Sequence, residues 1–204
     1  MGAKYLYLQK RVTELRRFLL PSKFDPTGLY SDRIHQRTAA FRLLVHAEFE
    51  SFLEDLVTAH ASECHDNWIN RNKPSITLAA LLAYDENEVR PPTSLLDPQQ
   101  KASNHFNDRL NSAVNRFQGK VRVRNHGVRE TNVLSMLLPI GIDALTLDTS
   151  WLLDLDNWAQ ERGAIAHQSS GKVQFQLDPA REYSRVKSLL AGFKVVEAAV
   201  MRLP

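Results

Sequence analysis

Apolar residues recur at steps of three and four along most of this chain, which is the spacing of one face of an α-helix. Residues 4–20 have this pattern, and Pro21 ends it. Residues 31–70 contain neither proline nor glycine and are predicted to form the longest helix, either whole or broken near Cys64. The same periodicity predicts further helices at residues 75–82, 99–118, 131–138, 148–167 and 179–200.

Two segments interrupt the helical pattern. Residues 84–98 contain three prolines and are predicted to form a long loop. Residues 172–177 alternate between apolar and polar side chains, which is typical of a short extended segment. Together these patterns predict an all-α bundle folded as one domain over residues 1–204, with an N-terminal helix and turn in 1–30 and the core in 31–204.

Composition narrows the class of protein. Of the 204 residues, 43% are hydrophobic and 24% are charged, which is ordinary for a globular domain. No apolar run approaches the ~18 residues of a membrane span, and the N-terminus lacks the apolar core of a secretory signal. The single cysteine, Cys64, excludes an internal disulfide framework and is typical of a reducing compartment. We therefore expect a cytoplasmic protein with no membrane partner.

The net charge is only +3, but basic residues gather in two clusters. The first is Lys10, Arg11, Arg16 and Arg17, and the second is Arg116, Lys120, Arg122, Arg124 and Arg129. Such clusters can neutralise the phosphates of a nucleic acid, although many are merely solvated surfaces. The second cluster, which has valines between its charges, is predicted to bind RNA.

Arg162 and His167 are the residues best suited to chemistry, because an arginine can hold a phosphate and a histidine titrates near neutral pH. On one continuous helix, five residues of separation direct the two side chains roughly 140° apart. Arg162 continues the apolar stripe of Trp158, whereas His167 lies on a more polar face. The alternative is that Arg162 snorkels or pairs with a core carboxylate and that His167 is an ordinary surface residue.

A metal site is a further alternative. His60 and Cys64 lie four residues apart, with His65 adjacent, a spacing that can present two zinc ligands. The sequence offers no complementary ligand pair, and it has neither a phosphate-binding glycine loop nor a nucleophile elbow. We therefore predict no metal and no cofactor.

Four short motifs follow one another along the chain. They are Val45–Leu56 in the longest helix, Asn125–Gly127, Gly141–Asp143 and Arg162–His167. Their order and spacing resemble the HEPN superfamily, and within it the group named for ribonuclease L and prokaryotic stress proteins; the likeness spans residues 31–200. The resemblance implies a four-to-five-helix core that forms a homodimer. The Arg and His motifs of two chains would then meet in a cleft, because a two-fold axis can gather side chains that one helix directs apart.

The resemblance also implies a function. Many members are metal-independent endoribonucleases of toxin–antitoxin, abortive-infection and other defence systems. In such a nuclease, the 2'-hydroxyl of RNA would attack the adjacent phosphorus and leave a 2',3'-cyclic phosphate. By this likeness, His167 transfers protons and Arg162 steadies the phosphate. The expected partners are RNA, a second copy of the chain, and an antitoxin or other operon partner protein.

Glu48 and Glu50 are further candidates for the site, because each lies beside an apolar stripe and a buried carboxylate needs a cation. Arg162 is the predicted cation, and Glu50 matches the acidic position of the family better. A purely structural ion pair is the alternative. Two positions depart from the family pattern: Gly163 follows the motif arginine where nuclease members often have a polar residue, and Ser169 stands where some toxins have a modified tyrosine.

Two other functions stay open at this point. One is a non-catalytic HEPN-like module that binds RNA or a nucleotide, because a shared fold does not prove a shared activity. The other is a helical interaction protein whose exposed apolar surface is an interface. RNA cleavage with and without a chelator separates the nuclease from both, and salt-dependent RNA binding separates the two from each other.

Overall fold

The computed structural model describes residues 2–85, 96, 105–167 and 176–204, with the helical backbone alone for 163–167. Its α-helices are α1 (Ala3–Leu19), α2 (Asp32–Arg71), α3 (Ile76–Ala83), α5 (Phe106–Gly119), α6 (Glu130–Leu137), α7 (Thr149–His167) and α8 (Pro179–Val200). Shorter helical turns are η1 (Lys120–Arg124), η2 (Leu138–Ile140) and η3 (Ala144–Thr146). No strand occurs within these ranges, so the predicted all-α class is confirmed.

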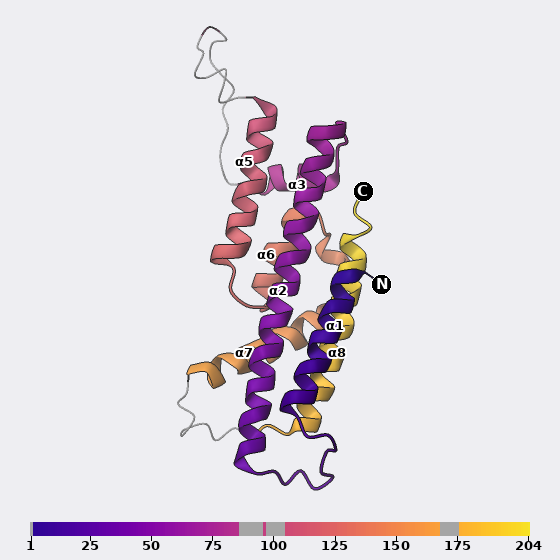
Figure 1. Cartoon of the computed structure of the whole chain (residues 1–204). Coiled ribbons are helices and arrows are strands. Elements are labelled where there is room, and N and C mark those ends of the chain that lie inside the picture. The colour runs from indigo at the N-terminus through magenta and orange to yellow at the C-terminus, as the bar shows by residue number, and fades with distance from the viewer. Residues whose placement is uncertain (1, 86–95, 97–104, 168–175) are drawn as a thin grey trace.

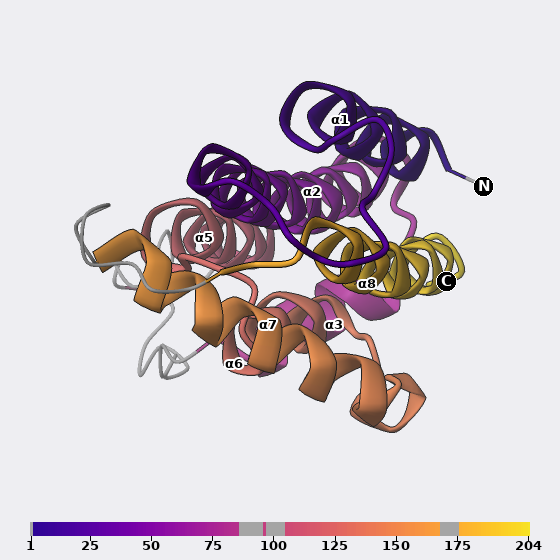
Figure 2. The ribbon, with the colours of Figure 1, turned by 90° about the horizontal axis from the view of Figure 1, so that it is seen from below.

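The long helix α2 is the centre of the bundle (Figure 1). It has 40 residues, which at 1.5 Å per residue makes it about 60 Å long. It contacts α1, α3, α5, α6, α7 and α8. Seen along the bundle, α1 lies on one side of α2, whereas α3, α6 and α7 lie on the opposite side (Figure 2). Because α2 spans the whole bundle, its side chains reach both the aromatic core and the residues that surround α7.

Local signals in the sequence explain where several helices begin. The Asp178 carboxylate accepts a hydrogen bond from the Arg181 backbone N–H at 2.7 Å, which caps α8 at Pro179. At the start of α7, the Asp148 carboxylate accepts a hydrogen bond from the Trp151 backbone N–H at 3.2 Å. These caps satisfy backbone donors that the first helical turn leaves without partners.

The structure decides between the two alternatives for the longest helix. The helix α2 is whole: it continues past Cys64 to Arg71 and ends where Asn72 adopts a left-handed conformation with φ of 50°. After α5 the basic segment Lys120–Arg124 forms the π-helical turn η1. Most of the loop predicted at 84–98 and of the extended segment predicted at 172–177 lies outside the described residues.

The core is aromatic where α2, α7 and α8 meet. The ring centroids of Phe49 and Phe193 lie 4.3 Å apart, and those of Phe49 and Trp158 lie 5.4 Å apart. Trp151 lies so close to Gly192 that an added Cβ would come within 2.1 Å of the indole Nε1 atom. The tight contact between α7 and α8 fixes the position of α7, which carries Arg162.

No helix in the described ranges combines the length and the apolar character that a bilayer crossing requires.

Candidate active site and basic surface

His46 on α2 and Trp158 on α7 form the floor of the candidate site. The His46 side chain is only 2% exposed, and its ring stacks on Trp158 with centroids 5.8 Å apart and an interplanar angle of 21°. Burial, together with the positive charge of nearby Arg162, lowers the pKa of His46 to about 4. His46 is therefore neutral at pH 7, and Arg162 lies near it on the next turn of α7 after Trp158.

Glu50 lies one turn after His46 and holds the loop that follows η1. One carboxylate oxygen accepts a hydrogen bond from the Gly127 backbone N–H at 2.5 Å. The other lies 3.8 Å from the His46 Nδ1 atom, which is too far for a hydrogen bond. Gly127 has a φ of 110°, a conformation that favours glycine. Glu50 thus fixes the Asn125–Gly127 motif against α2.

Asn125 connects this loop to α6. Its side chain is buried, and its oxygen accepts hydrogen bonds from Asn132 Nδ2 at 2.8 Å and from Ser135 Oγ at 3.1 Å. Because two donors hold the oxygen, the orientation of the amide is fixed and its NH2 group is directed elsewhere.

Three polar atoms of His46, Asn125 and Arg162 are buried and have no hydrogen-bond partner within the described ranges. They are His46 Nδ1, Asn125 Nδ2 and Arg162 Nε. A buried polar group without a partner costs free energy, so few are expected in a folded protein. The amide and the guanidinium are donors that an acceptor-rich anion such as a phosphate would satisfy.

The pairing predicted between Arg162 and a glutamate on α2 is wrong. Glu48 accepts hydrogen bonds from Arg11 on α1, whose Nε and Nη2 atoms lie 3.0 and 2.9 Å from its Oε1. Glu50 binds the Gly127 amide instead. Within the described part of the chain, no hydrogen bond or ion pair joins Arg162 to a carboxylate. Glu48 therefore faces α1 rather than the floor formed by His46.

The buried cation of the core is Arg42, which the sequence analysis missed. Arg42 and Glu182 on α8 are both 3% exposed, and Arg42 Nε donates to Glu182 Oε1 at 2.9 Å. A second guanidinium nitrogen donates to Glu161 at 2.7 Å, and Trp158 Nε1 donates to Glu182 at 2.8 Å. Burial opposes ionisation of Glu161, but hydrogen bonds and charges from Arg185 and Arg42 lower its pKa overall. This network neutralises Glu182 and Glu161 without using Arg162.

The described residues do not include the side chain of His167. His167 is the last residue of α7, and its backbone lies about 1.4 helical turns beyond Arg162. The predicted proton-transfer role of His167 therefore stays a prediction.

Two arginines of the predicted RNA-binding cluster form ion pairs with aspartates. Arg116 forms an ion pair with Asp85, and Arg129 forms one with Asp156 at 3.1 Å. The hydrogen bond from Arg129 is the main cause that lowers the pKa of Asp156. The side chains of Lys120, Arg122 and Arg124 on η1 are exposed, and η1 leads directly into Asn125. The exposed basic surface thus adjoins the candidate site.

His60 and Cys64, the two residues that could have bound zinc, contact each other, and His60 also contacts Thr77. His60 Nε2 lies 2.9 Å from Thr77 Oγ1 and 3.6 Å from Cys64 Sγ. No group of three or more metal-ligating side chains occurs in the ranges that the structure describes. Burial lowers the pKa of His60, which keeps it neutral beside these partners.

The chain matches the RiboL-PSP-HEPN family over residues 7–196. That match covers most of its length, so the protein belongs to this family, and the resemblance drawn from the four motifs is confirmed. Family membership points to an RNA-related function. No curated protein and no solved structure matches the chain significantly.

The low pKa of His46 makes a testable contribution to stability. The group is protonated in the unfolded chain below its ordinary pKa of 6.5 but in the folded chain only below about 4. Unfolding therefore takes up a proton between these values, and the free energy of unfolding should fall by about 3 kcal/mol as pH decreases from 6.5 to 4. Urea denaturation across this range should show a shallower decrease for His46→Phe, which keeps a ring against Trp158.

His126→Gln is the matched control, because His126 is exposed and lies on the neighbouring loop. It should retain the pH dependence of the wild type. An equal decrease in wild type and His46→Phe would show that other groups cause the acid destabilisation.

Proposed function

We propose that the protein is a metal-independent endoribonuclease that cleaves RNA by attack of the 2'-hydroxyl on the adjacent phosphorus, which yields a 2',3'-cyclic phosphate and a 5'-hydroxyl. One observation carries the proposal: Arg162 lies at the candidate site without a carboxylate partner in the described part of the chain. An arginine fork in a partly buried site is suited to the charge that develops on a phosphate during cleavage.

His167 is the proposed proton-transfer group, and His46 is not. General acid–base catalysis is most effective when the pKa of the group lies near the working pH. The pKa of His46 is about 4, so this ring is poorly suited to proton transfer at pH 7. His46 instead supports the site beside Arg162, and the Asn125 amide offers a further donor to a phosphate oxygen.

The second part of the proposal concerns assembly and context. Two side chains that leave one helix roughly 140° apart form one site more readily if two chains contribute to it. We infer a homodimer in which Arg162 of one chain acts with His167 of the other. A role as a toxin or a defence effector, controlled by an antitoxin or operon partner, is part of the same proposal.

RNA cleavage by the purified protein tests the chemistry. We expect cleavage of single-stranded RNA that is unchanged by EDTA, no cleavage of DNA of the same sequence, and products that end in a cyclic phosphate. DNA resists because it lacks the 2'-hydroxyl nucleophile. Cleavage that requires a divalent metal, or that leaves 3'-hydroxyl ends, would refute the mechanism.

A non-catalytic RNA-binding module is the second candidate, and Gly163 is the observation that favours it. Glycine follows the motif arginine at a position where nuclease members of the family often have a polar residue. Salt-dependent RNA binding without any cleavage would favour this function.

A further inference from the structure

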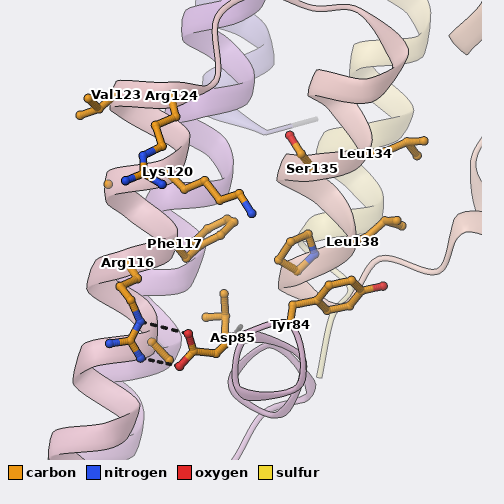
Figure 3. Close-up of a pocket in the computed structure, with 14 residues that line it drawn as sticks. Tyr84, Asp85, Arg116, Phe117, Lys120, Val123, Arg124, Leu134, Ser135 and Leu138 are labelled. Atoms are coloured by element: carbon orange, nitrogen blue, oxygen red, sulfur yellow. Dashed lines mark hydrogen bonds and ion pairs between the residues drawn. The ribbon is translucent and has the colours of Figure 1, made fainter. Parts of the chain in front are cut away.

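A groove lies between α5 with its extension η1 on one side and α3, α6 and η2 on the other (Figure 3). We call it the α5–α6 groove. Its volume is about 720 Å³, within the usual range of ligand-binding pockets. Its apolar lining includes Leu81, Phe117, Leu134, Leu138 and Pro139, and its polar lining includes Lys120, Arg124 and Ser135.

The two kinds of lining lie on different parts of the groove. The Phe117 ring occupies the floor between the two walls, whereas Arg124 and Lys120 lie above it on the α5–η1 wall (Figure 3). Tyr84 lies at the lower end of the groove and is 55% exposed. Arg116 is the third cation of this wall, and Asp85 neutralises it. The groove therefore combines an apolar, partly aromatic floor with a cationic upper edge.

This combination fits one nucleotide of a single strand. A nucleobase can pack on apolar and aromatic side chains, while a basic edge holds the phosphate attached to its sugar. An acidic peptide would also be attracted by the cations, but it has no need of the aromatic floor.

The groove also adjoins the candidate site. Ser135 lines the groove and donates to the oxygen of Asn125 at 3.1 Å. Arg124 lines it too and immediately precedes Asn125 in the chain. Asn125 in turn belongs to the loop that Glu50 holds against α2 through Gly127. This loop therefore connects the groove with Glu50, which lies one turn after His46 on α2.

We propose that the α5–α6 groove is a nucleobase subsite, which binds an unstacked base of the RNA close to the scissile linkage. The base packs on the floor and against Tyr84, and Arg124 binds the adjoining phosphate. This inference rests on the proposed function for the identity of its ligand as RNA, but it concerns binding rather than cleavage.

Fluorescence anisotropy with an RNA probe tests the subsite independently of catalysis. The probe is a labelled oligonucleotide with 2'-O-methyl groups at every position, which cannot be cleaved by the proposed mechanism. A series of matched probes carries one abasic nucleotide at successive positions. We expect wild-type affinity to fall roughly 5- to 100-fold at one position and little at the others.

Variants assign this loss to the groove. Tyr84→Ala should weaken binding of the intact probe and remove most of the penalty for the abasic nucleotide, with little loss of stability because Tyr84 is exposed. Arg124→Gln should weaken all probes alike and reduce the salt dependence of binding, by a slope of about 0.7 for one phosphate contact. Arg122→Gln is the matched control, because Arg122 is exposed on the same turn but does not line the groove; it should retain the abasic penalty.

The outcomes separate this inference from the proposed function. A position-specific abasic penalty that Tyr84→Ala removes supports the subsite even if the protein cleaves no RNA. Equal binding of intact and abasic probes overturns the subsite even if RNA is cleaved. Displacement of the RNA probe by polyglutamate, at an affinity that Tyr84→Ala leaves unchanged, would also overturn it, because the groove would then be a site for acidic peptides.

Discussion

Replacing Arg42 by methionine should lower the free energy of unfolding by about 3–5 kcal/mol. The substitution leaves Glu182, which is 3% exposed, with the Trp158 indole N–H as its remaining hydrogen-bond donor among the contacts described. A buried carboxylate that loses its cation either stays charged in a poorly solvating environment or takes up a proton, and both cost free energy. Urea denaturation at pH 7 measures the change.

Two further variants show whether the unpaired charge is the cause. Arg185→Met removes the exposed-side partner of Glu161 and should cost less than about 1 kcal/mol, as is usual for surface ion pairs. Arg42→Met combined with Glu182→Gln should be more stable than Arg42→Met alone, because glutamine still accepts from Trp158 without a charge. If the free energy of unfolding of Arg42→Met lies within about 1 kcal/mol of the wild-type value, the buried pair contributes no more to stability than a surface ion pair does.

Most helices could be predicted from the sequence because their signals are local. The periodicity of apolar residues and the cap at Asp178 each depend on neighbours within a few positions. The sequence places the end of this helix at residue 70, next to the observed Arg71, but it leaves a break near Cys64 open because polar residues there resemble a helix end. Those residues stay helical because α2 extends along α3 and α5, whose packing a single-helix pattern does not reveal.

The candidate site could be predicted only in part. Arg162 was identified because an arginine can hold a phosphate and because it begins the Arg162–His167 motif, but other cations pair with the glutamates of this region. Arg11 binds Glu48, and Arg42 binds Glu182. Both members of the second pair occupy core-facing positions of their own helices, in line with Val45 on α2 and with other buried residues on α8. An arginine and a glutamate at core-facing positions of two different helices could have predicted a buried ion pair.

The basic cluster shows a different limit of sequence reasoning. Arg116 and Arg124 look alike in sequence, yet Arg116 is paired with Asp85, 31 residues away. Arg129 is paired with Asp156, 27 residues away. Such pairing depends on how helices pack, so only the structure shows that Arg116 and Arg129 form ion pairs with aspartates.

Arg162 can test function separately from stability, because Glu48 and Glu50 have other partners. Arg162→Ala should reduce RNA cleavage by about 100-fold or more, because it removes the donors proposed to stabilise the developing charge. No ion pair joins Arg162 to a carboxylate in the described ranges. The free energy of unfolding of the Arg162→Ala variant should therefore stay within about 1 kcal/mol of the wild-type value. His167→Ala should reduce cleavage by a similar factor, as expected for loss of a proton-transfer group.

Mixing these two inactive variants tests the composite site. If Arg162 of one chain acts with His167 of its partner, each mixed dimer contains one site with both residues and one site with neither. Random exchange of subunits places half of the dimers in the mixed form, so the mixture should recover about a quarter of the wild-type rate. Sedimentation before and after mixing checks that dimers form and exchange. If both residues act within one chain, no mixed dimer contains a complete site and the mixture stays inactive, which would refute the composite site while leaving the loss of activity in each variant as support for the nuclease.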